Sequence, residues 1–127
     1  MEKLLGLEMP QRVKDIRVLL AELQRLASHL IWIGTHAMEI GAVSMLFYAV
    51  TEREKFLNIN ELIAGFRFFP SYFRIGGLRE DLPRGFHQAV NAILDDFPSK
   101  IDKFEDLLTK NDIFMRRTQG EIGRAHV

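Results

Sequence analysis

Two chemically active side chains lie within one apolar stretch of the sequence, and they are the first candidates for a functional site. His36 and Glu39 are three residues apart, so they share one face of a helix, and His29 lies two turns before His36. A metal site needs three or four convergent ligands, and no second such pair occurs, so no metal is predicted. Two interpretations remain open: a buried, hydrogen-bonded pair that fixes helix packing, or a titratable pair that relays protons.

A second candidate combines arginines with aromatic side chains in one short segment. Arg67, Arg74 and Arg79 surround a group of aromatic residues at positions 66 to 73, among them Phe69 and Tyr72. Such a pattern can bind single-stranded nucleic acid, but a net charge of zero argues against that function. More often the aromatic residues pack inward and the arginines pair with carboxylates, here such as Glu39 or Asp81.

The glycine pair Gly76-Gly77 follows this segment and predicts a turn with positive φ. Its surroundings match neither a dinucleotide fingerprint nor a phosphate loop. Residues 51–55 (TEREK) are interpreted as the solvated end of a helix. No spacing indicates a Ser–His–Asp triad or a pair of catalytic carboxylates.

Composition narrows the class of protein further. The 127 residues suffice for one small domain with a core, and 47% are hydrophobic. The absence of cysteine excludes disulfides and thiolate-ligated clusters held by these residues. Residues 30–50 are long enough to span a bilayer, but they contain His36 and Glu39 and lack a close basic flank. We therefore predict no transmembrane segment in this chain. Residues 1–6 lack the long apolar run of a secretion signal, which predicts a cytoplasmic protein.

The elements that must position these residues are helices. Apolar residues at three- and four-residue steps predict a helix over 10–33, which Gly34 ends or bends. A second helix is predicted over 35–55, and its apolar part, 40–50, is expected to be enclosed by other helices.

Further signals divide the remainder of the chain. Asn58 is predicted to cap a short helix that Gly65 stops, and residues 67–75 are expected to be extended. Asp81 marks a helix start, and Pro98 either kinks that helix or begins another. One more helical turn is predicted over 111–117. Short connections favour antiparallel packing, so the fold class is a mainly α, antiparallel helical bundle with one irregular excursion.

The last seven residues, 121–127 (EIGRAHV), match nothing before them. They equal the translation of the start of a widely used sequencing adapter. We interpret them as a non-native tail, excluded from fold reasoning, and residues 1–120 as a fragment of a longer helical domain.

Several of these pieces together resemble a known family. They are residues 17–25 (RVLLAELQR), 35–42 (THAMEIGA), 52–55 (EREK) and 74–83 (RIGGLREDLP). The combination is similar to the D subunit (49 kDa type) of the proton-pumping NADH–quinone oxidoreductase, respiratory complex I. The resemblance covers roughly residues 1 to 120.

The resemblance implies a fold, a function and partners. The fold is that of the nickel–iron hydrogenase large subunit without its metal. The family helps to form the quinone headgroup cavity beside the terminal [4Fe-4S] cluster, which the B subunit of the complex holds. Electrons from NADH reach quinone there, coupled to proton translocation. The implied partners are the B and C subunits and, in the membrane arm, the H subunit. The implied location of this chain is peripheral, on the cytoplasmic side of the inner membrane. The fragment alone is expected to bind no cofactor and to be inactive.

Carried over by residue, the resemblance gives Glu39 and His36 the role of a proton relay near quinone. Glu39 stands where the family usually has aspartate. Arg67, Phe69, Tyr72 and Arg74 fall in the segment near the terminal cluster.

The turn residues Gly76, Gly77 and Asp81 follow that segment. Phe69 occupies the place of a histidine that can take up a proton when the cluster is reduced. A buried Glu39 beside the 67–77 segment is expected. The alternatives are a membrane-bound hydrogenase relative and a non-catalytic helical interaction module.

Overall fold

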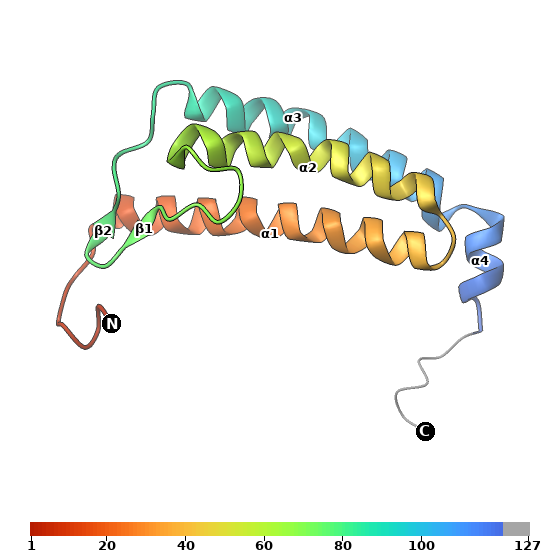
Figure 1. Cartoon of the computed structure of the whole chain (residues 1–127), viewed down its shortest axis with the longest axis horizontal. Coiled ribbons are helices and arrows are strands. Elements are labelled where there is room, and N and C mark those ends of the chain that lie inside the picture. Colours follow the sequence, from red (N-terminus) through yellow and green to blue (C-terminus); the bar gives the residue numbers. More distant parts are fainter. Residues whose placement is uncertain (121–127) are drawn as a thin grey trace.

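A computed structural model of the chain describes residues 1–120 and shows a mainly helical protein (Figure 1). A five-residue π-helix, Glu105–Thr109, continues the third helix. The helices are α1 (Gln11–Glu39), α2 (Val43–Ala64), α3 (Phe86–Phe104) and α4 (Asp112–Thr118), and the strands are β1 (Phe73–Arg74) and β2 (Gly77–Leu78). The predicted mainly α class, interrupted by one irregular excursion, is confirmed.

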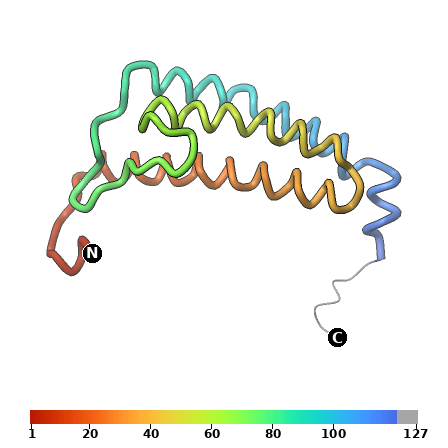
Figure 2. Tube along the Cα trace, viewed as in Figure 1, coloured from red at the N-terminus to blue at the C-terminus, as the bar shows by residue number. Residues whose placement is uncertain are grey.

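Three long helices form the body of the molecule, with α2 between α1 and α3 (Figure 2). α1 and α2 are antiparallel and joined by a short turn. Buried apolar residues recur at three- and four-residue steps on facing sides of the helices, which gives each helix one apolar stripe. The stripe of α1 contains Ile16, Leu20, Leu23, Ala27 and Leu30; that of α2 contains Met45, Ala49, Phe56, Ile59 and Ile63; that of α3 contains Phe86, Val90 and Ile93.

Gly34 does not end the first helix, so the predicted boundary there is wrong. α1 continues to Glu39, and residues 35–39 belong to it rather than to α2. Gly34 is buried, and a Cβ at this position would lie 3.1 Å from Cδ1 of Leu46 and 3.2 Å from Cβ of Ala49. The missing side chain therefore lets α1 and α2 approach closely, and the chain reverses later, through Gly41 with φ of 101°.

Two other predicted boundaries differ, and one is confirmed. Asn58 does not cap a helix but lies inside α2, whose apolar stripe continues past it. Gly65 ends α2 in the left-handed conformation, as predicted. The helix expected from Asp81 begins at Phe86, after Gly85.

The side chain of Asp81 does not start a helix but contacts the loop before α3 and an arginine of α1. It accepts a hydrogen bond from the Leu82 N–H at 2.8 Å and pairs with Arg12 of α1 at 2.8 Å. Arg12 holds the pKa of Asp81 below its usual range. Asp81 thus fixes the loop that precedes α3 onto α1.

Two predictions for the rest of the chain can also be compared with the structure. Pro98 lies inside α3 without ending it, and the turn predicted over 111–117 is confirmed as α4.

The apolar segment 40–50 is not enclosed, contrary to expectation. Val43, Phe47 and Tyr48 are exposed at 49%, 67% and 52%. Among the helices of residues 1–120, none has the combination of length and apolar character that crossing a membrane requires. The predicted tail, 121–127, lies outside the described residues.

Candidate functional site

The arginine and aromatic excursion between α2 and α3 is held to the core by one tyrosine. Tyr72 is 1% exposed, and its hydroxyl donates a hydrogen bond to the carbonyl oxygen of Glu80 at 2.8 Å. The backbone N–H of Arg79 in turn donates to the Tyr72 carbonyl at 2.9 Å. Burial raises the pKa of Tyr72. A phenol held in this way anchors the excursion rather than acting on a substrate.

Arg67 fixes the start of the excursion to the end of α2. Its guanidinium donates to Asn58 Oδ1 at 2.8 Å and to Glu61 Oε2 at 2.9 Å, and it also pairs with Glu54. Asn60 returns a hydrogen bond to the Arg67 carbonyl. Pairing with carboxylates is predicted for these arginines, but Arg67 takes partners on α2 and neither Glu39 nor Asp81.

The tip of the excursion is a two-stranded hairpin in which Gly76 adopts a φ of 91°. The turn predicted at Gly76 and Gly77 is therefore present. Phe73 pairs with Leu78, and Arg74 pairs with Gly77. The Arg74 residue itself is exposed.

Arg17 of α1 and Glu2 attach this hairpin to the helices. Arg17 donates to the carbonyls of Arg74 and Gly77, both at 2.8 Å, and forms two hydrogen bonds with the Glu2 carboxylate. The Gly76 N–H also donates to Glu2 at 2.9 Å. The hydrogen bonds from Arg17 and then from Gly76 lower the pKa of Glu2 to about 2.

A cavity of about 690 Å³ lies under the excursion, between α1 and α2. Its walls are mainly apolar and aromatic, and Arg53, Arg67, Gln24 and Asn60 supply the polar groups. The guanidinium of Arg53 lies over the ring of Phe68, 5.1 Å from the ring centre. The cavity is thus a structured, largely apolar recess with cationic side chains on its wall.

Phe69 belongs to this wall but has an unusual position. Its side chain is 95% exposed, and its φ is +53°, a left-handed conformation that costs a residue with a Cβ about 1–2 kcal/mol. Neighbouring Phe66, Phe68 and Phe73 are also exposed, at 61%, 54% and 48%. The described residues therefore leave a group of aromatic side chains open beside the cavity.

The prediction that Glu39 is buried beside the excursion is wrong. Glu39 and His36 are both exposed, at the opposite end of α1 from the hairpin. Gln24 and Arg67 line the same cavity, and Glu39 lies fifteen positions after Gln24, roughly 22 Å along the helix. Within residues 1–120, the Glu39 side chain is therefore open to solvent.

His36 makes local contacts only. Its Nδ1 lies 3.0 Å from the carbonyl oxygen of Trp32, and the two rings are 5.2 Å apart in a tilted arrangement. Within the 120 described residues, no three His, Asp or Glu side chains converge to hold a metal ion. The structure therefore places the predicted site residues in two separate regions.

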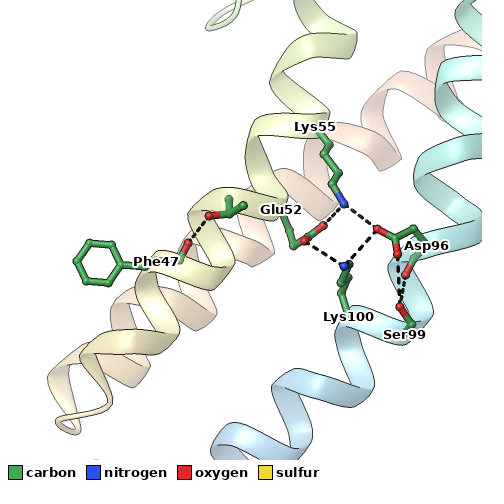
Figure 3. A network of polar contacts seen from close by, with 7 residues as sticks. Phe47, Glu52, Lys55, Asp96, Ser99 and Lys100 are labelled. Atoms are coloured by element: carbon green, nitrogen blue, oxygen red, sulfur yellow. Dashed lines mark hydrogen bonds and ion pairs between the residues drawn. The ribbon is translucent and has the colours of Figure 1, made fainter.

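One cluster is missed by sequence reasoning. The TEREK segment is not a solvated helix end, because Glu52 is only 8% exposed and lies between α2 and α3 (Figure 3). Lys55 Nζ lies 2.6 Å from Glu52 and 2.7 Å from Asp96, and Lys100 Nζ lies 3.9 Å and 3.6 Å from the same two carboxylates.

The charges in this cluster stabilise one another. The hydrogen bond with Asp96, followed by that with Glu52, raises the pKa of Lys55, and Lys55 lowers the pKa of Asp96. A signal is available in the sequence, since Glu52 falls on the same three- and four-residue repeat as Ala49 and Phe56. The cluster joins α2 to α3 and lies apart from both predicted regions.

Comparisons with known proteins give one consistent result. Residues 39–126 match the family described as respiratory-chain NADH dehydrogenase, 49 kDa subunit. Proteins named as the D subunit of NADH-quinone oxidoreductase are 54% identical in Citrifermentans bemidjiense and 55% identical in a Roseiflexus species, each over 119 residues or 94% of this chain. The alignments cover 31% and 28% of those two relatives, so the chain spans about three tenths of their length.

Proposed function

Because the chain belongs to the family of the 49 kDa subunit of respiratory-chain NADH dehydrogenase, we propose that it acts within a complex I enzyme. Its role there is to form part of the wall of the site where quinone receives electrons that originate from NADH. The observation that carries this proposal is the match of residues 39–126 to the family. The relatives are named the D subunit of NADH-quinone oxidoreductase, and that name supplies the reaction proposed here.

The surfaces of the chain support a role inside an assembly. The aromatic group of Phe66, Phe68, Phe69 and Phe73 is open at one end of α2, and Phe47 and Tyr48 are open at the other. Contiguous exposed apolar side chains of this kind mark surfaces that contact other protein segments. We propose that the excursion faces the B subunit of the complex and its [4Fe-4S] cluster, and that the C and H subunits are further partners. The site of action is the cytoplasmic side of the membrane.

The residues of this chain cannot ligate that cluster, because the sequence contains no cysteine. These residues instead hold the excursion in position and provide titratable groups that can carry protons. Arg67, Tyr72 and the Glu2–Arg17 pair hold the excursion against the helices through the contacts described above. His36 and Glu39 carry the titratable groups at the end of α1, beside the turn to α2. Their exposure makes them accessible to groups outside this stretch, and we assign them the relay of protons toward quinone.

The proposal is tested in the full-length protein, assembled into the enzyme. Glu39→Gln is expected to lower NADH oxidation with quinone as acceptor by at least tenfold. Oxidation with ferricyanide, which accepts electrons ahead of quinone, should remain unchanged and report correct assembly. Glu22→Gln, on the same helix and paired with Arg25, is the matched control and should leave both rates unaltered.

A different pattern would contradict the proposal. Normal quinone reduction by the Glu39→Gln enzyme would remove Glu39 from the relay. Loss of both activities would mean that Glu39 serves assembly instead.

A further inference from the structure

Arg117 of α4 contacts a backbone carbonyl 77 positions earlier in the chain. Its guanidinium donates a hydrogen bond to the carbonyl oxygen of Ile40, the residue that ends α1. The last carbonyls of a helix have no partner within the helix and carry a partial negative charge. An arginine at this place therefore satisfies one of these carbonyls and opposes the charge at the helix end.

Gly41, the next residue, is shaped to receive the same arginine. Its φ is +101°, and a Cβ added there would collide with Nη1 of Arg117 and lie 3.4 Å from its Cζ. Gly65, Gly76 and Gly85 also have positive φ, but nothing lies within 4 Å of the Cβ each would carry. Backbone conformation alone explains those three glycines. At Gly41 the absent side chain also makes room for the guanidinium.

The short helix that carries Arg117 has a side-chain hydrogen bond of its own at each end. The side chain of Asn111 accepts hydrogen bonds from the backbone N–H groups of Ile113 and Phe114, at 2.9 Å and 3.3 Å. The Thr118 hydroxyl donates to the Phe114 carbonyl at 2.9 Å. Arg117 thus projects from an ordered turn of helix, and the contact joins two elements with defined ends.

We infer that Arg117 is a positioning residue, which holds the turn of Ile40, Gly41 and Ala42 and thereby the end of α1 that carries His36 and Glu39. This inference rests on the proposed function, since the turn matters for activity only if Glu39 does. Arg117 acts through the backbone, and no contact between it and the Glu39 side chain is invoked.

The neighbouring arginine supplies a matched control. Arg116 is exposed on the same helix, carries the same charge, and no hydrogen bond or ion pair joins it to another residue of the described chain. Arg116→Gln and Arg117→Gln therefore change the net charge equally. Only the second removes the contact with Ile40.

The first measurement is hydrogen exchange in the assembled enzyme. The amides of Ile40, Gly41 and Ala42 donate to carbonyls of α1 at 3.2, 2.9 and 2.8 Å, so they report the closure of the turn. Arg117→Gln should accelerate their exchange at least tenfold, and Arg117→Lys should do so by a smaller factor. Arg116→Gln should leave them unchanged. Equal exchange in the Arg116 and Arg117 variants would overturn the inference.

The second measurement is quinone reduction, with ferricyanide reduction as the assembly control. Arg117→Gln should lower the kcat for quinone about tenfold, and combining it with Glu39→Gln should reduce the rate no further than Glu39→Gln alone. Fully multiplicative losses would show that Arg117 acts elsewhere and would overturn its positioning role. Accelerated exchange together with a fully active Glu39→Gln enzyme would support the contact and overturn the proposed relay, so the two failures are distinguishable.

Discussion

The two ends of the α1–α2 pair differ in how they are built. At the hairpin end, the excursion is held by the buried Tyr72, by the ion pairs of Arg67 and by the Glu2–Arg17 pair. At the turn end, His36 contacts only its own helix, Glu39 is exposed, and one side chain, Arg117, reaches the turn from outside.

This difference separates two kinds of candidate residue. The hairpin end is specified by contacts within these 120 residues, so its polar groups are largely accounted for by structure. The turn end presents an exposed Glu39 and a His36 whose contacts stay within its own helix. Exposed polar and aromatic side chains without an internal role are better candidates for function than satisfied ones. The comparison therefore favours the turn for chemistry and the excursion for shape.

The largest expected effect is on Tyr72, at the hairpin end. Tyr72→Ala removes a fully buried aromatic ring and should destabilise the chain by about 3–5 kcal/mol in denaturant unfolding. Tyr72→Phe, which loses only the hydrogen bond to Glu80, should cost about 1 kcal/mol. The other tyrosine, Tyr48 near the turn, is 52% exposed, and Tyr48→Ala should change stability by less than about 0.5 kcal/mol. Equal losses at the two tyrosines would remove the contrast between the ends.

Variants of Glu52 test whether the middle of α2 is held by polar contacts, as the hairpin end is. Glu52→Gln leaves Lys55 and Lys100 with one carboxylate instead of two and should cost about 1–3 kcal/mol. Glu54→Gln on the same helix is the control, because Arg67 keeps its pair with Glu61, and its cost should stay below about 1 kcal/mol. Chemical denaturation of both variants at pH 7 gives the comparison. An insensitive Glu52 would mean that the cluster is only a surface network.

The attachment of the hairpin should depend on pH in a defined window. The Glu2 carboxyl titrates at 4.5 when free, whereas its pKa in the folded chain is about 2. Its contribution to stability is therefore complete above pH 4.5 and is lost as the pH falls toward 2. Protection of the Gly76 amide, which donates to Glu2, should fall across this window once the exchange rate is corrected for the intrinsic effect of pH. Glu2→Gln should abolish that pH dependence, and its persistence would point to another acid.

Phe69 is expected to give the smallest structural effect. The ring is 95% exposed, so Phe69→His should change the free energy of unfolding by less than about 0.5 kcal/mol. In the assembled enzyme, with Phe69 in place, the potential of the neighbouring cluster should depend little on pH. Introducing histidine should steepen that dependence toward about 59 mV per pH unit, because one proton then accompanies one electron. A steep slope already present with Phe69 would show that another group takes up the proton.

Local signals in the sequence are reliable where one residue's conformation decides the structure. Gly65 ends a helix and Gly76 forms a turn with positive φ, as predicted, and Gly65 also adopts a positive φ. Gly34 misleads, because a glycine that permits close packing and one that ends a helix look the same in sequence. Asn58 resembles a cap, although the apolar stripe continues through α2 beyond it.

Burial is harder to predict, because it depends on which elements are present. The apolar composition of residues 40–50 predicts enclosure, yet composition cannot say whether the covering segments lie within the same stretch of chain. The predicted burial of Glu39 fails for this reason. Glu52 is missed for the opposite reason: a charged segment is interpreted as exposed although its position on the buried stripe indicates otherwise.

Gly34 has a consequence for the cavity under the excursion. At Gly34 the absent side chain lets α1 lie close to Leu46 and Ala49 of α2, whereas the open end of the pair, under the excursion, holds the cavity. Leu20 and Leu57 lie on the walls of the open end, and Leu20 is roughly 21 Å along the helix from Gly34. A bulkier residue at position 34 would press α1 away from α2, and because the same two helices line the recess, the change would reach the recess without touching it.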